Sequence, residues 1–205
     1  MELKKALEEL RKEKKRKFSQ SVDLIINLKG FDLRRDSVNV VINVPHKIRD
    51  KKVGGFFEKK SGLVDSVTKV EFGKYKDKNA LKKLVNKYDY FIAIAELMPS
   101  VAKTFGKVLG PAGKMPSPQL GIIPQQNDDF IKKELEKIAK AVKIRVKEAS
   151  VKLNIGNESM KDEEIIDNFN AIYKAIVESL PKKKDNVKNV MLKFTMSKPI
   201  KLEIK

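Results

Sequence analysis

The sequence predicts a mixed α+β and α/β protein with two domains. A split terminal α+β domain with an antiparallel sheet would be made from both ends of the chain, and a Rossmann-like α/β domain with a parallel sheet would be inserted between them. Both ends carry runs in which apolar and polar residues alternate, as in a sheet with one face in solvent. The middle carries unbroken apolar runs between amphipathic segments, which is typical of β-α-β units.

The 205 residues suffice for two domains of about 100 residues each. We place the split domain at 1–50 with 148–205 and the inserted domain at 51–147. The chain would then cross between the domains near 47–53 and near 145–150. The alternative that the sequence leaves open is one continuous domain.

The chain begins with a segment, residues 2–17, that predicts a short amphipathic helix. Leu3, Ala6 and Leu10 follow one another at helical spacing, which places them on one face. Leu7 is left out of this apolar face. The segment ends in a run of cations next to an aromatic residue.

Two alternating strands are expected next, at 20–29 and 38–44. The short connection between them favours an antiparallel pair. In the first strand the alternation places Val22 towards the core, and it places Ser21 and Asp23 on the solvent face.

The inserted domain is expected to alternate short strands with helices. An apolar run at 88–95 is typical of a strand covered on both faces. Pro99 suits the first turn of the next helix, and Asn127-Asp128-Asp129 suits the start of a later one. In order, the expected elements are strands at 53–58 and 69–72, a helix at 79–87, a strand at 88–95, helices at 97–108 and 129–142, and a strand at 143–146.

The C-terminal part returns to alternation. Residues 149–155 predict a strand, a helix with a wide apolar stripe is expected at 159–177, and 187–205 is expected to be mostly extended with an interruption at Pro199. These segments repeat the pattern of the N-terminal strands, which is why we assign them to the same domain.

A loop is expected at Gly106–Gly121, where Gly and Pro are too dense for the interior of a helix or strand. It fails the test for a nucleotide phosphate loop, since Gly113-Lys114 precedes Met115 rather than Ser or Thr, and Val108 stands where a Gly is required. Two interpretations stay open: an ordered, charged surface loop, or a backbone-rich contact for an anion or RNA.

Composition favours a polyanion as the partner. The formal net charge is +18, against a magnitude of about 2–8 for small soluble domains, and such a field attracts nucleic acid before anionic membranes. The chain has no cysteine and one histidine, His46, which excludes disulfides and Cys-based or His-rich metal sites, so no metal or cofactor is expected. No apolar run reaches the roughly 18 residues of a membrane span, so we expect a cytoplasmic protein without membrane contact.

Two patches combine groups that can bind RNA. Phe18 stands near Ser21 and Asp23, and Phe194 opens the run Phe194–Ser197. Hydroxyl and carboxylate groups can bind the 2′-hydroxyl or bases, and an aromatic or Met side chain can pack on ribose or bases. The alternative for Phe18 and Met196 is packing in the core. No carboxylates or nucleophiles have a catalytic spacing, so no catalytic residue is expected.

Several blocks together resemble the L-one family of large-subunit ribosomal proteins, most closely its archaeal branch. They occur in the family's order and span nearly the whole chain. The blocks are Arg16–Asp23, Val44–His46, Leu109–Pro116, Ile155–Met160 with Asp162-Glu163, and Thr195–Ser197.

The resemblance implies a non-enzymatic ribosomal protein whose split domain binds a ribosomal RNA stalk and a similar structure in the protein's own messenger. It also implies a stalk movement linked to release of deacylated tRNA, contacts with other ribosomal components, and a monomer when free. RNA contacts carried over by position are Phe18, Ser21, Asp23, Thr195, Met196 and Ser197. Candidates for additional phosphate contacts are Lys15, Arg16, Lys17 and Lys152.

Two positions depart from the family pattern, which usually has Glu at Asp23 and Gly at Ser197. A side chain at Ser197 would hinder a close backbone approach to RNA. Two rival functions remain: an enzyme or binder that holds a phosphorylated ligand at Gly106–Gly121, and an unspecific basic binder of nucleic acid.

Overall fold

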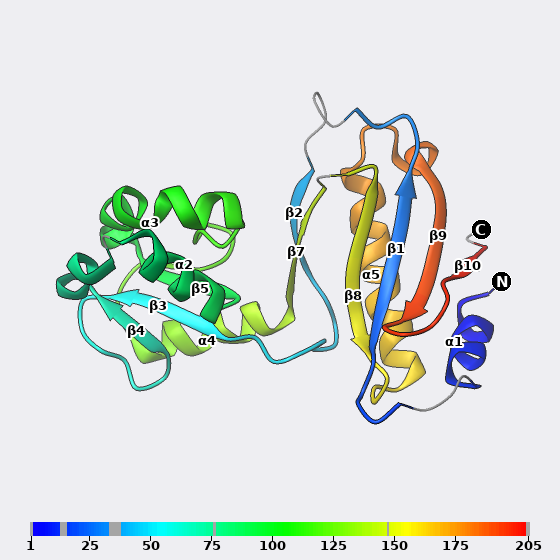
Figure 1. Ribbon diagram of the computed structural model, residues 1–205, viewed down its shortest axis with the longest axis horizontal. Helices are drawn as coiled ribbons and strands as arrows, with labels where there is room; N and C mark the ends of the chain where they lie inside the picture. Colours follow the sequence, from blue (N-terminus) through cyan, green and yellow to red (C-terminus); the bar gives the residue numbers. More distant parts are fainter. Residues whose placement is uncertain (1, 13–15, 33–37, 76, 147, 204–205) are drawn as a thin grey trace. The chain divides into compact units, whose positions relative to one another are not determined.

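The computed structural model describes residues 2–12, 16–32, 38–75, 77–146 and 148–203 (Figure 1). The chain forms two compact units, unit 1 with Met1–Arg49 and Lys140–Lys205, and unit 2 with Asp50–Ala139. The expected mixture of an antiparallel and a parallel sheet is confirmed.

Unit 1 is built on a four-stranded antiparallel sheet in the order β10-β9-β1-β8. Strand β1 alternates half-buried and buried residues along its whole length, as the sequence predicts, and Val22, Leu24 and Ile26 are fully buried. The strands are β1 (Ser21–Leu28), β8 (Ser150–Asn157), β9 (Val187–Phe194) and β10 (Ile200–Leu202).

Two helices bury the apolar side of this sheet. Helix α5 (Asp162–Ser179) lies along one face (Figure 1), and α1 (Leu3–Lys12) contacts α5, β9 and β10. Leu7 of α1 is fully buried in the core. Its omission from the apolar face was therefore wrong, because the helix packs against both a sheet edge and another helix and needs a wider apolar stripe.

The predicted pairing of the first two strands is also wrong. Strand β1 pairs with β8 and β9, whereas β2 (Asn39–Asn43) pairs with β7 (Ala141–Arg145). Strand β1 lies between two strands of its own length, since β8 and β9 match its eight residues, whereas β2 has five. The proposed domain boundary at 147 had put β7 in the inserted domain, yet its pairing with β2 lies in unit 1.

Unit 2 holds a parallel sheet in the order β4-β3-β5-β6, with helices in the connections that follow β4 and β5. Its strands are β3 (Val53–Phe57), β4 (Asp65–Thr68), β5 (Tyr90–Ile94) and β6 (Ile122–Ile123). Its α-helices are α2 (Lys78–Lys87), α3 (Met98–Ala112) and α4 (Asp128–Lys140), and two short 3-10 helices are η1 (Lys69–Tyr75) and η2 (Ala95–Leu97). A third 3-10 helix, η3 (Lys183–Asn186), precedes β9 in unit 1.

Two sequence-based assignments in unit 2 were wrong. Residues 69–72 form the start of η1 rather than a strand, and the Glu71 carboxylate accepts a hydrogen bond from the Thr68 N–H at 3.1 Å, which closes the turn. The expected loop at Gly106–Gly121 begins as helix, because α3 runs on to Ala112. Burial of Leu109 stabilises the last turn of α3. Gly113 ends the helix with a positive φ of 72°.

Candidate nucleic-acid interface

The two predicted RNA-binding patches lie together at one end of the antiparallel sheet. Strand β1 begins where β9 ends, and Figure 1 shows the two ends side by side. The Ser21 N–H donates to the Thr195 hydroxyl oxygen at 2.9 Å, and the Thr195 N–H donates to the Ser21 carbonyl oxygen at 3.1 Å. The fold thus brings Ser21 and Thr195 into direct contact.

Hydroxyl groups connect this pair to Asp23. The Ser21 hydroxyl donates to the Asp23 carboxylate at 3.0 Å, and the hydroxyl oxygens of Ser21 and Thr195 are 2.9 Å apart. Since Ser21 gives its single proton to Asp23, Thr195 must donate to Ser21. Asp23 retains lone pairs that can accept a 2′-hydroxyl or base amino proton from an RNA.

The turn after β9 presents Met196 to solvent. The side chain of Ser197 does not project from the turn, because its hydroxyl oxygen accepts the Phe194 N–H at 2.8 Å. The Ser197 N–H in turn donates to the Phe194 carbonyl at 3.1 Å. Ser197 therefore closes the turn on which Met196 is carried.

Phe18 and Met196 are strongly exposed, at 52% and 58% of their surface. The alternative that these side chains pack in the core is wrong. Both side chains are therefore free to pack against a partner, although exposed apolar side chains such as Val70 also occur elsewhere in the chain.

Cations precede β1 and lie along the neighbouring strands. Arg16 and Lys17 are exposed, and Lys15 lies outside the described residues. Lys152 is exposed on β8, where it stands opposite Ile25. Lys193 stands opposite Asp23 on β9. It is not among the residues predicted from the sequence, although the alternation of β9 indicates its face.

Comparisons with known proteins identify the family of this chain. A model of the ribosomal protein L1p/L10e family matches residues 10–198. The chain belongs to this family. Similar proteins named large ribosomal subunit protein uL1 come from Pyrobaculum calidifontis, with 34% identity covering 98% of this chain and 92% of the relative, and from Korarchaeum cryptofilum, with 37% identity covering 89% and 84%. A third, from Nanoarchaeum equitans, is 34% identical over 94% of this chain and 95% of the relative.

In this member of the L1p/L10e family, two residues of the segment Gly106–Gly121 make structural contacts. The Lys114 ammonium donates to the carbonyl oxygens of Val85 and Tyr88, both at 2.8 Å, and so caps the C-terminal end of α2. The Gly121 N–H donates to the buried Glu134 carboxylate at 2.8 Å. A side chain at Gly121 would meet the Phe91 carbonyl oxygen at 2.5 Å, which explains the glycine.

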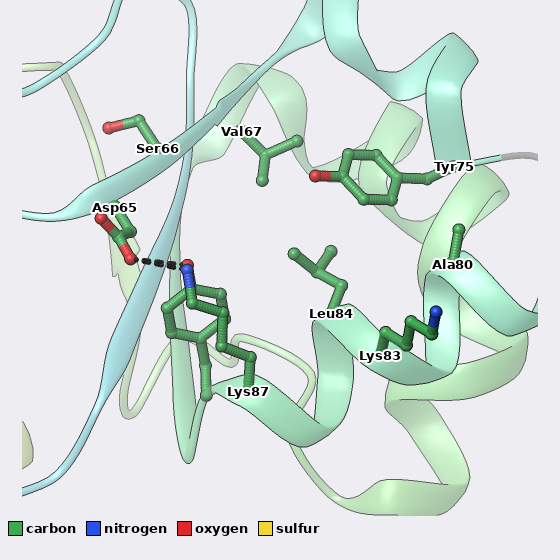
Figure 2. A pocket seen from close by; sticks show the side chains of 9 residues that line it. Asp65, Ser66, Val67, Tyr75, Ala80, Lys83, Leu84 and Lys87 are labelled. Carbon is green, nitrogen blue, oxygen red and sulfur yellow. Dashed lines mark hydrogen bonds and ion pairs between the residues drawn. The ribbon is translucent and has the colours of Figure 1, made fainter.

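A cavity of about 500 Å³ in unit 2 lies between β4 and α2. Figure 2 shows Val67, Leu84 and the Tyr75 hydroxyl around a common space. At its edge Asp65 accepts hydrogen bonds from Tyr88 at 2.7 Å and Lys87 at 3.1 Å, and these bonds lower the pKa of the Asp65 carboxyl. No residue of Gly106–Gly121 lines this cavity among the described residues.

The described part of the chain also lacks two other kinds of site. There, no group of three or more His, Asp or Glu side chains is placed to hold a metal ion. No helix within the same residues has the length and apolar character to cross a membrane.

Proposed function

We propose that this chain is a structural, non-enzymatic protein of the large ribosomal subunit, active in the cytoplasm, that binds a ribosomal RNA stalk through unit 1. Membership of the L1p/L10e family and the names of the archaeal relatives support the ribosomal role. The assignment of the binding surface rests on one observation. The side chains of Phe18 and Met196 are exposed beside the hydrogen bonds between Ser21 and Thr195.

The surface combines an aromatic ring, hydrogen-bond acceptors and cations, which are groups that can bind structured RNA. Phe18 offers a face on which a base can stack, and Asp23 offers acceptors for a 2′-hydroxyl or an amino group. The lysines and arginines supply attraction to phosphate that is sensitive to salt and independent of sequence. Selectivity for the stalk would come from the fixed positions of Phe18 and Asp23. Affinity would come from these residues together with the lysines and arginines.

The same surface supports two finer roles. It would bind a similar structure in the protein's own messenger and repress translation, and as part of the stalk the protein would contact deacylated tRNA transiently during its release. In a cell-free translation assay, repression of the protein's own messenger should be relieved by added stalk RNA. Repression that persists in excess stalk RNA would contradict a shared surface.

Photo-cross-linking tests the site assignment directly. The full chain is irradiated with a fragment of archaeal stalk ribosomal RNA, and the cross-linked peptides are identified by mass spectrometry. We expect cross-links in the peptides that contain Phe18 and Met196. Cross-links confined to Asp50–Ala139 would place the RNA on unit 2 and contradict the assignment.

A further inference from the structure

A buried polar side chain lies directly behind the proposed RNA surface. Gln20 immediately precedes β1 and is only 5% exposed. Its carboxamide oxygen accepts the N–H of Met196 at 3.2 Å. Glutamine is mostly exposed in folded proteins, and a buried polar side chain normally has a hydrogen-bond partner.

Glu158 holds the backbone of Gln20 from the other side. The Gln20 N–H donates to the Glu158 carboxylate at 3.2 Å, and the Glu158 N–H donates to the Gln20 carbonyl oxygen at 2.8 Å. Gln20 is thus fixed through its backbone to the segment after β8 and through its side chain to the turn after β9.

Arg11 of α1 holds Glu158 in turn. Its guanidinium donates to the carbonyl oxygens of Glu158 at 3.0 Å and Met160 at 2.8 Å, and to the Asp162 carboxylate at 2.8 Å. A planar fork with several donors suits three such acceptors at once, which a lysine could not reproduce. The chain of contacts therefore runs from α1 through Glu158 and Gln20 to Met196.

We propose that Gln20 is a positioning residue for RNA recognition, held by Glu158 and Arg11. It sets the direction of the Met196 backbone and so the placement of Thr195 and Met196 on the surface. This inference rests on the proposed function, and it adds residues that act behind the surface to those that lie on it. Helix α1 would contribute to selectivity for RNA because its residue Arg11 holds Glu158, which in turn holds Gln20.

The test compares Gln20→Met with the same change at Gln126 of unit 2. Gln126 also bonds backbone groups, donating to the Lys59 carbonyl at 2.7 Å and accepting the Lys59 N–H at 3.2 Å. Gln20→Met removes one side-chain to backbone hydrogen bond and Gln126→Met removes two, and both put an unbranched side chain of similar length in place of glutamine. Affinities are measured for a stalk RNA fragment and for an unrelated RNA duplex of equal length.

For Gln20→Met we expect the affinity for stalk RNA to fall about 10-fold, the upper end of what one hydrogen bond contributes. The affinity for duplex RNA should change less than about twofold, because phosphate attraction does not depend on the turn. Gln126→Met should leave both affinities unchanged. Equal losses for stalk and duplex RNA, or a stalk affinity unchanged by Gln20→Met, would overturn the inference.

Hydrogen exchange gives a readout that does not depend on RNA. In free protein, the Met196 amide should exchange about 10-fold faster in Gln20→Met than in the unmodified chain, because its acceptor is gone. An unchanged rate at Met196 would overturn the positioning role even if binding falls.

Two substitutions at Glu158 test whether its carboxylate is needed to hold Gln20. Glu158→Gln keeps an oxygen that can accept the Gln20 N–H and should preserve the stalk preference, whereas Glu158→Ala should reduce it. If the unmodified protein itself shows no stalk preference, the proposed function fails, and the Met196 exchange rate still decides whether Gln20 positions the turn.

Discussion

The hydroxyl oxygens of Ser21 and Thr195 lie 2.9 Å apart, although the two residues are 174 positions apart in the chain. Together with the backbone hydrogen bonds between the same residues, this contact joins the start of β1 to the end of β9. It places the two predicted RNA-binding patches on one continuous surface.

Thr195→Val should weaken the binding of stalk RNA by about 1–2 kcal/mol, since the change removes the hydroxyl that bonds Ser21 and leaves the Ser21 N–H without its acceptor. Filter-binding titration with stalk RNA measures the loss. Thr195→Ser retains the hydroxyl and serves as the control. Unchanged affinity for Thr195→Val would remove Thr195 from the site.

Phe18→Ala should weaken stalk binding by about 1–3 kcal/mol if a base stacks on the ring. Phe130→Ala is the matched control, because Phe130 is also exposed, at 40%, and lies in unit 2. Fluorescence anisotropy with labelled stalk RNA measures both variants. Equal affinities for the two variants would show that Phe18 does not touch the RNA.

Ser197→Gly restores the residue that the family pattern usually has at this position. The structure predicts a loss rather than a gain, because the Ser197 hydroxyl accepts the Phe194 N–H and closes the turn. We expect stalk affinity to fall about two- to fivefold, the effect of one modest hydrogen bond. Tighter binding by Ser197→Gly would show instead that the serine side chain hinders the approach of RNA.

Lys152→Gln tests whether this exposed lysine of β8 contacts a phosphate of the RNA. If Lys152 neutralises one phosphate, the plot of log affinity against log salt should become shallower by about 0.7–0.9. Lys83→Gln in unit 2 should leave the slope unchanged. Titrations at several salt concentrations give the slopes, and an identical slope for Lys152→Gln and the unmodified protein would exclude this contact.

Lys114→Met should destabilise unit 2 by about 1.5–3 kcal/mol, the range for hydrogen bonds made by a charged group, because two carbonyl oxygens at the end of α2 lose their donor. Urea denaturation followed by circular dichroism measures the change, and stalk affinity should stay constant. Stabilisation of the unmodified protein by nucleotides or phosphate, lost in Lys114→Met, would favour the rival ligand site instead.

Local patterns predicted most elements because burial follows periodicity closely here. Alternation in β1 placed Val22 in the core and Ser21 on the other face, as observed. The choice of strand partners could not be read in this way, because β1 pairs with strands that lie more than 100 residues away in the chain. The helical turn at 106–112 was missed for a related reason: burial of Leu109 outweighs the local cost of Gly110 and Pro111.

The resemblance to a family gives candidate surface residues, but it does not give the residues that hold them in place. Gln20 sits among polar residues at the start of a strand, which in sequence resembles a solvated position. Only the fold shows that its carboxamide oxygen accepts the Met196 N–H and that Glu158 holds its backbone. Contacts between residues this far apart in the chain leave no local pattern.

The most direct test of the central claim is a competition titration at about 0.15 M monovalent salt. Labelled stalk RNA is bound to the full chain and displaced with unlabelled stalk RNA, tRNA or duplex RNA of equal length. We predict a preference for stalk RNA of about a thousandfold, within the range of about 10³–10⁷ found for specific nucleic-acid binding. A ratio near one would mean that the surface around Ser21 and Thr195 attracts RNA only by its charge, and it would contradict recognition of the stalk.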